Sequence, residues 1–185
     1  MPMSLTAHRF TVAEYHRMGD AGIFHEDDRV ELIDGQVVEM TPIGLDHAGC
    51  VIRLTGMFAA VAGDASLSVQ NPLALGEHQE PQPDFAVLRH RADGYRARRP
   101  QPADVLLIIE VGDSSANSDR HTKIPLYAIT GIPEAWLANL PGDCIEVYRR
   151  PVGGRYTQME TVRRGATLAP LAFPSLRLSA DRILG

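Results

Sequence analysis

The spacing of apolar residues predicts two helices in the first third of the chain. Thr11 and Glu14 form a capping box that opens a helix over residues 12–20. From about Asp46 to Ala62, apolar residues recur three and four positions apart, which is typical of a helix with one buried face. Asp46 would be the N-cap of this second helix.

Between these helices, the sequence has the pattern of paired strands. Residues 29–33 and 36–40 are rich in apolar residues, and they flank the dipeptide Asp34-Gly35. This dipeptide is the strongest short signal for a two-residue hairpin turn, because both of its residues tolerate a positive φ. We therefore expect a β-hairpin ahead of the second helix.

The middle of the chain predicts three strands of different kinds. Residues 67–75 contain Pro72, which cannot donate to a strand ladder, so we expect an edge or bulged strand. Residues 84–88 follow the turn Pro81-Gln82-Pro83 and form a second strand. The unbroken apolar run over residues 104–111 predicts a central strand that is buried on both faces.

The remaining pattern predicts one more helix and a second hairpin. Ser114, Ser115 and Ser118 would cap a helix that runs to about Ile129 and ends at Gly131-Ile132-Pro133. Pro125 would remove a hydrogen bond from this helix and bend it. The later segments are strands over 135–138, 144–148 and 156–162, the last two joined around Gly153-Gly154, and a short turn capped by Ser179. This order indicates an α+β fold, with one mixed sheet flanked by helices, in a single domain over residues 1–185.

Composition narrows the class of protein. The chain has 185 residues, of which 44% are hydrophobic and 22% are charged, as in one compact soluble domain. No stretch approaches the roughly 20 apolar residues that span a bilayer, and the first residues lack the order of a secretory signal. We therefore expect a cytoplasmic protein without membrane contact. Cys50 and Cys144 lack metal-ligand spacing, and we expect two buried free thiols.

The charged residues show one unusual feature. The formal net charge of −5 argues against electrostatic coating of nucleic acid, although it leaves room for a local basic patch. Of the 18 basic residues, 17 are arginines and one is Lys123. One interpretation is a compositional bias that left a single lysine by chance. The other is that position 123 requires an ammonium group, which shares a proton more readily than a guanidinium.

Two carboxylates stand at the ends of neighbouring predicted strands. Asp84 opens one strand and Glu110 lies near the end of the next, so both can reach one point if these strands are side by side. A buried carboxylate must be neutralised, hydrogen-bonded or placed on a metal ion. The functional interpretation is Mg²⁺ or Mn²⁺ held by two carboxylates, a backbone carbonyl and waters. The structural alternative is an Asp in a turn and a Glu that caps a helix.

Lys123 lies on the predicted helix that follows Glu110. Its side chain could swing back over the end of the strand and join the two carboxylates. Asp119, Lys123 and Tyr127 would share one helical face, because they are four residues apart. The structural alternative is therefore a surface ion pair between Lys123 and Asp119, with Tyr127 as a core aromatic residue.

These residues lie in motifs that resemble the Uma-two family of endonucleases, which belongs to the PD-(D/E)xK, restriction-endonuclease-like superfamily. The motifs are RVELIDGQVVEM, QPDFAV around Asp84, LLIIEV around Glu110, GIPEAWL and IEVYRR, with His47 opening the second helix and Lys123 four residues before Tyr127. The similarity covers about residues 10 to 150. The chain departs from the family at Gly112-Asp113, where Leu-Ser-Pro is usual, and at Ala135, where an aromatic residue is common.

The resemblance implies a restriction-endonuclease-like core and a metal-dependent endonuclease that acts on DNA. Asp84, Glu110 and the carbonyl of Val111 would hold Mg²⁺ or Mn²⁺, and Lys123 would orient a water or neutralise charge on the phosphate. The superfamily lysine usually stands two residues after the glutamate, which is Gly112 here, so the lysine would have moved onto the helix. A homodimer is expected, because a double-strand cut needs two sites.

Two further residues and one loop are candidates with structural alternatives. Glu31 corresponds to the glutamate of the first family motif and would add a contact to the metal site; alternatively it is solvated. His47 would assist proton transfer or contact phosphate; alternatively it is structural or exposed. Five arginines in the loop between the carboxylate strands would bind phosphates close to the cleavage site, or they are simply solvated: Arg89, Arg91, Arg96, Arg98 and Arg99.

Two other classes of function stay open at this point. The first is a non-catalytic module that binds nucleic acid or protein on the same fold. The second is a metal-dependent phosphodiesterase for a small substrate, for which an acidic surface is no handicap. The sequence has no Gly-rich phosphate loop, Ser/His/Asp elbow or Rossmann fingerprint that would favour another chemistry.

Overall fold

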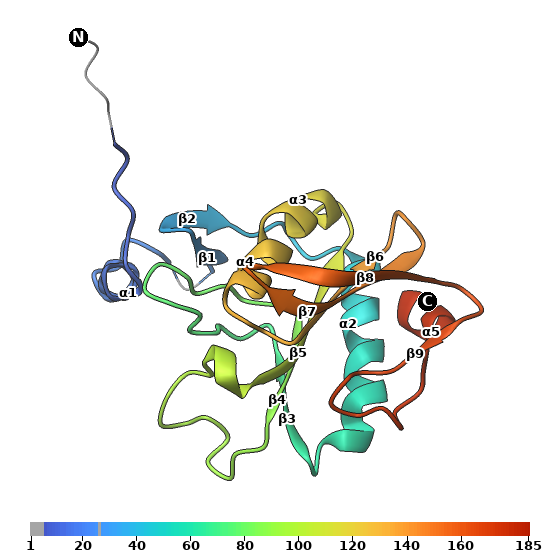
Figure 1. Cartoon of the computed structure of the whole chain (residues 1–185). Coiled ribbons are helices and arrows are strands. Elements are labelled where there is room, and N and C mark those ends of the chain that lie inside the picture. The colour runs from blue at the N-terminus through green and yellow to red at the C-terminus, as the bar shows by residue number, and fades with distance from the viewer. Residues whose placement is uncertain (1–5, 26) are drawn as a thin grey trace.

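A six-stranded sheet forms the centre of the structure (Figure 1). The computed structural model describes residues 6–25 and 27–185. Strands β5 and β6 run parallel, and the other neighbouring pairs are antiparallel, so the predicted mixed sheet and α+β fold class are confirmed. In spatial order the strands are β3 (Ala65–Val69), β4 (Phe85–Arg89), β5 (Val105–Gly112), β6 (Glu134–Asn139), β7 (Cys144–Val152) and β8 (Arg155–Arg163).

Strand β5 lies inside the sheet because its residues are almost all apolar. Ile109 and Val111 pack on one face, and Ile108 packs on the other, with all three side chains fully buried. The predicted burial on both faces is confirmed. Because side chains alternate along a strand, Glu110 shares the face of Ile108, where it is 1% exposed.

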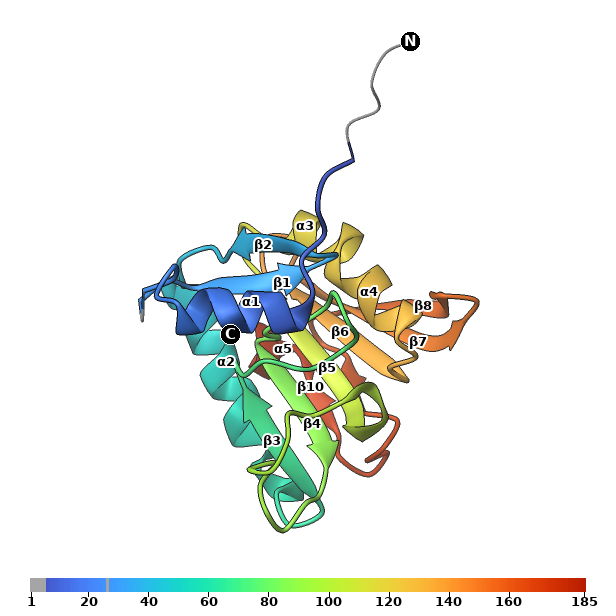
Figure 2. The same cartoon turned by 90° about the vertical axis from the view of Figure 1, so that its left-hand side faces the viewer.

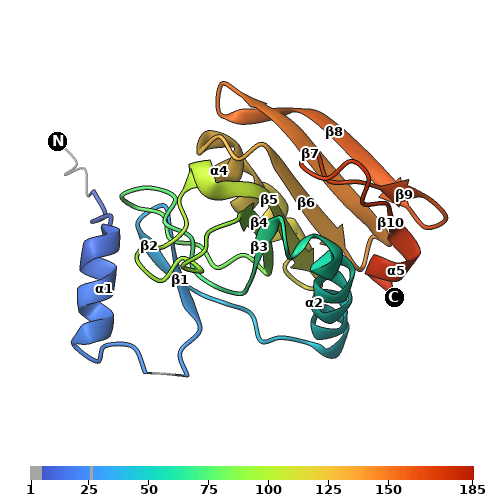
Figure 3. The same ribbon diagram turned by 90° about the horizontal axis from the view of Figure 1, so that it is seen from below.

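Helices cover both faces of the sheet (Figures 2 and 3). The face of Val111 packs against α2 (Leu45–Phe58), the short 3₁₀ helix η1 (Ala59–Val61) and α5 (Ala180–Leu184). The face of Glu110 packs against α4 (Lys123–Ile129), with α3 (Ala116–His121) ahead of it in the chain. Beside α5, strands β9 (Thr167–Leu168) and β10 (Leu178–Ser179) form a small antiparallel pair, and Ser179 is the N-cap residue of α5.

The N-terminal helix and hairpin form a separate layer beside the sheet (Figure 2). Helix α1 (Val12–Asp20) has the predicted capping box of Thr11 and Glu14. Strands β1 (Val30–Ile33) and β2 (Gln36–Glu39) form the predicted hairpin, and the turn residues Asp34 and Gly35 have φ of 51° and 72°. Two positive φ angles in succession are typical of a type I′ turn.

Two predicted boundaries differ from the structure. Helix α2 begins at Leu45 after the N-cap Gly44, so Asp46 lies in the first turn and the prediction of Asp46 as the cap is wrong. Strand β3 begins at Ala65 and ends at Val69, whereas a strand over residues 67–75 was expected. Gln70 has a φ of 51°, and the chain leaves the sheet there, before Pro72. The predicted position of this strand at the sheet edge is confirmed.

The single helix predicted after β5 is two helices. Helix α3 ends at His121, Thr122 joins it to α4, and Pro125 lies in the first turn of α4. Pro125 has no N–H to donate to the preceding turn, so it ends α3 and is tolerated where a helix begins. Ser115 is the N-cap residue of α3, but its hydroxyl donates to Asp119 at 2.7 Å and accepts no hydrogen bond from a backbone N–H of the helix.

Two simpler expectations concern the thiols and the membrane. Cys50 and Cys144 are both buried and free, as predicted. Within residues 6–25 and 27–185, no helix combines the length and the apolar character that crossing a bilayer requires.

The remaining short element is the 3₁₀ helix η2 (Pro102–Asp104), which leads into β5.

Candidate active site

A cleft of about 270 Å³ opens between the β1–β2 hairpin, the first turn of α2, the end of β5 and the two helices α3 and α4. Its lining includes all five residues that were predicted to carry the chemistry as side chains: Glu31, His47, Asp84, Glu110 and Lys123. These side chains come from β1, α2, β5, α4 and the residue before β4, and all of them line one cleft.

Asp84 and Glu110 lie across from each other on adjacent strands. Phe85 of β4 pairs with Ile109 of β5 in antiparallel register, so the residue before Phe85 faces the residue after Ile109. Oδ2 of Asp84 accepts a hydrogen bond from the Val111 amide at 2.9 Å, and the Asp84 amide lies 3.5 Å from Oε2 of Glu110. The strand register thus brings the two carboxyl groups together.

Lys123 lies between the hairpin and the strand carboxylate. Its Nζ is 3.1 Å from Oε1 of Glu31 and 3.6 Å from Oε1 of Glu110, and its side chain is only 12% exposed. The alternative of a surface ion pair with Asp119 is wrong, because Asp119 is buried and Lys123 pairs with Glu31 and Glu110.

Tyr127 lies one helical turn after Lys123, on the same face of α4. Its hydroxyl donates a hydrogen bond to Oε1 of Glu110, and the residue is fully buried. The sequence indicated a shared face with Lys123 but gave no sign of this hydrogen bond. Tyr127 therefore fixes the orientation of the Glu110 carboxyl group from inside the core.

His47 and Glu31 bring the hairpin and α2 to the same cleft. Nε2 of His47 lies 2.9 Å from Oδ1 of Asp84, while its Nδ1 is buried without a hydrogen-bond partner among the described residues. Oε2 of Glu31 accepts a hydrogen bond from the Gln82 amide at 3.0 Å. The alternatives of an exposed His47 and a solvated Glu31 do not agree with this arrangement.

The charges of these groups depend on burial and on their neighbours. Burial by itself would raise the pKa of Asp84, but the hydrogen bond and charge of His47 and the Val111 amide outweigh it and lower that pKa. Burial raises the pKa of Glu110 well above its usual value, against the opposing charge of Lys123. Burial would lower the pKa of Lys123, yet the charges of Glu110 and Glu31 raise it, so Lys123 keeps its proton.

The donor chemistry of the cleft fits a hard divalent cation. The lining contains six carboxylates, against Arg29 and Lys123 as permanent cations, so the cleft has an excess of negative charge. Oxygen donors are the ligands that Mg²⁺ and Mn²⁺ prefer. Within the described ranges, no three Asp, Glu, His or Cys side chains are placed to hold an ion together. A cation in this cleft would therefore rest on two carboxylates, with a backbone carbonyl and water as further ligands.

The residue two positions after Glu110, where the superfamily usually has its lysine, is Gly112, and the packing around it explains why it has no side chain. A Cβ atom on Gly112 would lie 2.5 Å from Cα and 2.6 Å from Cβ of Ala116, at the start of α3. Contacts this short require the backbone to move. The close approach of α3 to the end of β5 thus excludes a lysine at position 112, and the ammonium group beside Glu110 comes from Lys123 of α4.

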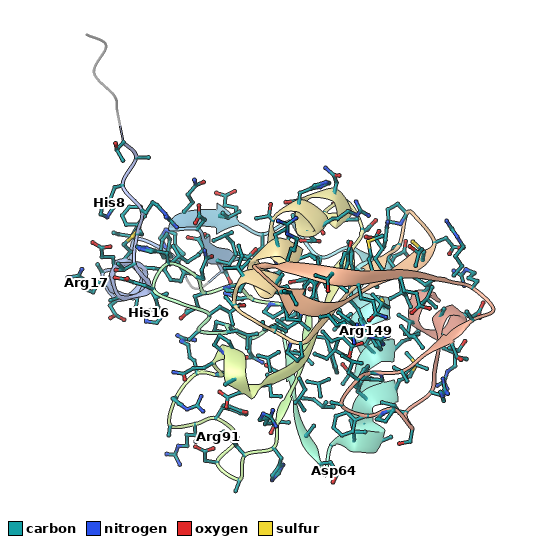
Figure 4. The ribbon with its side chains drawn as sticks, in the orientation of Figure 1. His8, His16, Arg17, Asp64, Arg91 and Arg149 are labelled. Atoms are coloured by element: carbon teal, nitrogen blue, oxygen red, sulfur yellow. The ribbon has the colours of Figure 1, made fainter. Side chains whose placement is uncertain are left out.

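The arginine-rich loop lies at the other end of these strands. Strand β4 runs from Phe85 beside Asp84 to Arg89, and the loop leads from there to η2 and the start of β5. In Figure 4, Arg91 lies low in the view, below α4, whereas α3 is at the top of the same view in Figure 1. The expected position of this loop close to the carboxylates is wrong, because it connects the opposite strand ends.

Most of the loop arginines also have partners within the protein. Arg91 pairs with Asp93 at 2.6 Å, Arg98 donates to Asp104 at 2.9 Å, and Arg99 lies 3.3 Å from Glu80. Arg89 donates to the carbonyl of Ala103, and Arg96 is exposed. Binding of nucleic acid by this loop stays a prediction, for which these pairs leave few unengaged donors.

Comparisons with known proteins give a family and a fold. The family model Uma2, described as "Putative restriction endonuclease", matches residues 12–181. A solved structure, described as "a putative nuclease belonging to DUF820 from Anabaena variabilis ATCC 29413", is 19% identical and has a TM-score of 0.75. The alignment covers 95% of this chain and 97% of that chain. No curated protein matches the chain significantly.

Proposed function

The chain belongs to the Uma2 family, and from this premise we propose that it is a metal-dependent nuclease that hydrolyses phosphodiester bonds of DNA. The observation that carries the proposal is the convergence of Asp84, Glu110 and Lys123 in one acidic cleft. Two adjacent carboxylates with an ammonium group provide both a cation site and a positive charge for a phosphate.

Asp84, Glu110 and the carbonyl of Val111 would hold Mg²⁺ or Mn²⁺. The N–H and C=O of a strand residue point to the same side, so the Val111 carbonyl faces the edge where its amide meets Asp84. When bound, the cation would supply the positive charge that stabilises negative charge developing on the phosphate.

Lys123 would contact the phosphate, and His47 would assist proton transfer. Lys123 keeps its proton, so it serves as a hydrogen-bond donor and a positive charge, not as a general base. His47 holds one carboxylate oxygen of Asp84 through Nε2, and its Nδ1 is buried without a partner among the described residues, so help with proton transfer would require the ring to move. Glu31 would position Lys123 from the hairpin side.

The test is an activity profile of the full chain. Supercoiled plasmid, single-stranded DNA, RNA and a small chromogenic phosphodiester are each incubated with Mg²⁺, Mn²⁺ or EDTA. We expect cleavage of DNA that EDTA abolishes and that is lost in Asp84→Asn. Glu134→Gln is the matched control, because Glu134 is also a buried strand carboxylate but bonds to Arg149 outside the cleft.

The same profile separates the alternatives. Binding of nucleic acid without cleavage under any metal condition would support a non-catalytic module and contradict the nuclease. Hydrolysis of the small phosphodiester alone would indicate a phosphodiesterase for small substrates. Cleavage that persists in Asp84→Asn would exclude the proposed carboxylate pair.

We further propose a homodimer, because cleavage of both strands needs two clefts. The mass of the protein in solution, measured by light scattering with and without a DNA duplex, tests this. A monomer in both conditions that still makes double-strand breaks would contradict it.

A further inference from the structure

The cleft contains one arginine that the nuclease proposal has not used. Arg29 directly precedes β1, and its carbonyl accepts a hydrogen bond from the Met40 amide at 2.8 Å, which extends the hairpin by one pair. Arg29, Glu31 and Ile33 are two residues apart, and all three line the cleft. The strand alternation therefore places Arg29 on the same face as Glu31.

The guanidinium group of Arg29 is weakly engaged by the protein. Its hydrogen-bond contacts are the carbonyl of Thr41 at 3.5 Å and Sδ of Met40 at 4.0 Å, and both are long. In the part of the chain that the structure describes, residues 6–25 and 27–185, it has no carboxylate partner. A guanidinium has five N–H donors, so most of the donors of Arg29 are available to a ligand.

The electrostatics of the cleft give this arginine a specific use. A phosphodiester that approaches Asp84 and Glu110 meets the negative charge of six lining carboxylates. Lys123 is the other permanent cation of the lining, but its ammonium group already contacts Glu31 and Glu110. Arg29 is therefore the cation that can offset repulsion of the substrate.

We propose that Arg29 binds the non-bridging oxygens of a substrate phosphate at the wall of the cleft formed by the hairpin. This inference rests on the proposed nuclease function and assigns the residue that holds the substrate. The planar guanidinium can donate two parallel hydrogen bonds to one phosphate, whereas an ammonium acts as a point charge. Arg29 would thus bind and orient the phosphate without touching the cation site.

The experiment uses the full chain and two substrates. Binding of a fluorescent DNA duplex is measured by anisotropy in EDTA over a series of NaCl concentrations, and hydrolysis of bis(4-nitrophenyl) phosphate is measured with Mn²⁺. Arg29→Gln should weaken duplex binding about ten-fold and reduce the slope of log K against log[salt] by about one, as expected for one lost phosphate contact. It should also raise KM for the small diester about ten-fold, with a smaller change in kcat.

Two further variants make the result specific. Arg29→Lys should keep the salt slope but recover only part of the affinity, because the charge remains while the bidentate geometry is lost. Arg182→Gln is the matched control, since Arg182 is an exposed arginine on α5 that does not line the cleft. This variant should match the wild type in the slope of log K against log[salt], in affinity for the duplex and in KM for the small diester.

The outcomes distinguish this inference from the function on which it rests. If the wild type cleaves DNA while Arg29→Gln and Arg182→Gln give the same slope and KM, the role of Arg29 is excluded and the nuclease proposal stands. If the wild type neither binds the duplex nor hydrolyses either substrate, the nuclease proposal fails and the role of Arg29 fails with it.

Discussion

The backbone amide of Val111 donates a hydrogen bond to Oδ2 of Asp84 at 2.9 Å. This bond joins the residue before β4 to the backbone at the end of strand β5, so the Asp84 carboxyl group is held by main chain. Glu110, the neighbour of Val111, is held by the hydroxyl of Tyr127. Both carboxyl groups of the candidate cation site are therefore oriented by the buried part of the fold before any ligand arrives.

Replacement of Glu110 by glutamine should abolish Mn²⁺ binding without unfolding the protein. The change is nearly isosteric, but it removes an anionic ligand, so we expect no binding heat in isothermal titration. Burial raises the pKa of this carboxyl well above its usual value, so loss of the charge should not lower Tm. Glu134→Gln should bind Mn²⁺ like the wild type. Wild-type affinity in Glu110→Gln would exclude Glu110 as a ligand.

Replacement of Lys123 by arginine tests whether the single lysine acts in catalysis. The arginine keeps the charge and can still pair with Glu31, but it is larger and planar, and the lysine side chain is only 12% exposed. We expect the cleavage rate at saturating Mn²⁺ to fall about a hundred-fold. A melting curve of the variant separates this loss from overpacking, which costs about 1–3 kcal/mol. An unchanged rate would mean that Lys123 has only a structural role.

A methyl group at position 112 should disturb both stability and the site. In Gly112→Ala the new Cβ overlaps Ala116, so α3 must shift away from β5. We expect a loss of about 1–3 kcal/mol in the free energy of unfolding, measured with urea. Gly56→Ala in α2 is the control, because no atom lies within 4 Å of the added methyl group. That variant should gain about 0.5–1 kcal/mol, as alanine is the better helix former. Equal stabilities would show that α3 is not fixed by this contact.

Acid should weaken the attachment of α3 to β7. Arg120 donates to Glu146 at 2.9 Å and lowers the pKa of that carboxyl from 4.5 to about 2, although burial opposes the shift. A pKa that is lower in the folded state means that the stabilisation is complete above pH 4.5 and is lost as the pH falls toward 2.

The corresponding measurement is the free energy of unfolding of Glu146→Gln as a function of pH. The wild type should exceed the variant by about 1–2 kcal/mol at neutral pH, and the difference should shrink below pH 4.5. Glu160→Gln is the control on the neighbouring strand, since Glu160 is 60% exposed and lies 3.9 Å from Arg149. A difference between wild type and Glu146→Gln that stays constant down to pH 2 would contradict this assignment.

Local patterns predicted the elements that short-range physics determines. The capping box at Thr11 and the turn at Asp34-Gly35 each satisfy their own backbone groups within a few residues, so helix α1 and the first hairpin follow the prediction. The apolar run of β5 also predicted its central place. The break between α3 and α4 was only partly foreseen, because Pro125 indicated a bend but not a new helix.

The candidate site was predicted less completely, because its contacts join distant parts of the chain. Asp84 and Glu110 could be paired from strand ends, Lys123 was indicated as the single lysine, and the family resemblance pointed to Glu31 and His47. The hydrogen bond of Tyr127 depends on the depth at which α4 packs, and no spacing encodes that depth. The loop arginines were misplaced because the sequence does not show at which strand ends a loop lies relative to Asp84.

Because Lys123 is the single lysine of the sequence, chemical labelling of lysine side chains reports on this one position. The sequence offers one ε-amino group, and the ion pairs with Glu31 and Glu110 hold it where reagents reach it poorly. Acylation of this amine requires both ion pairs to break, so its rate measures how often the ammonium group is released in the folded protein. A ligand that fills the cleft would slow the same reaction, and the extent of labelling at this one position would then report occupancy without any assay of turnover.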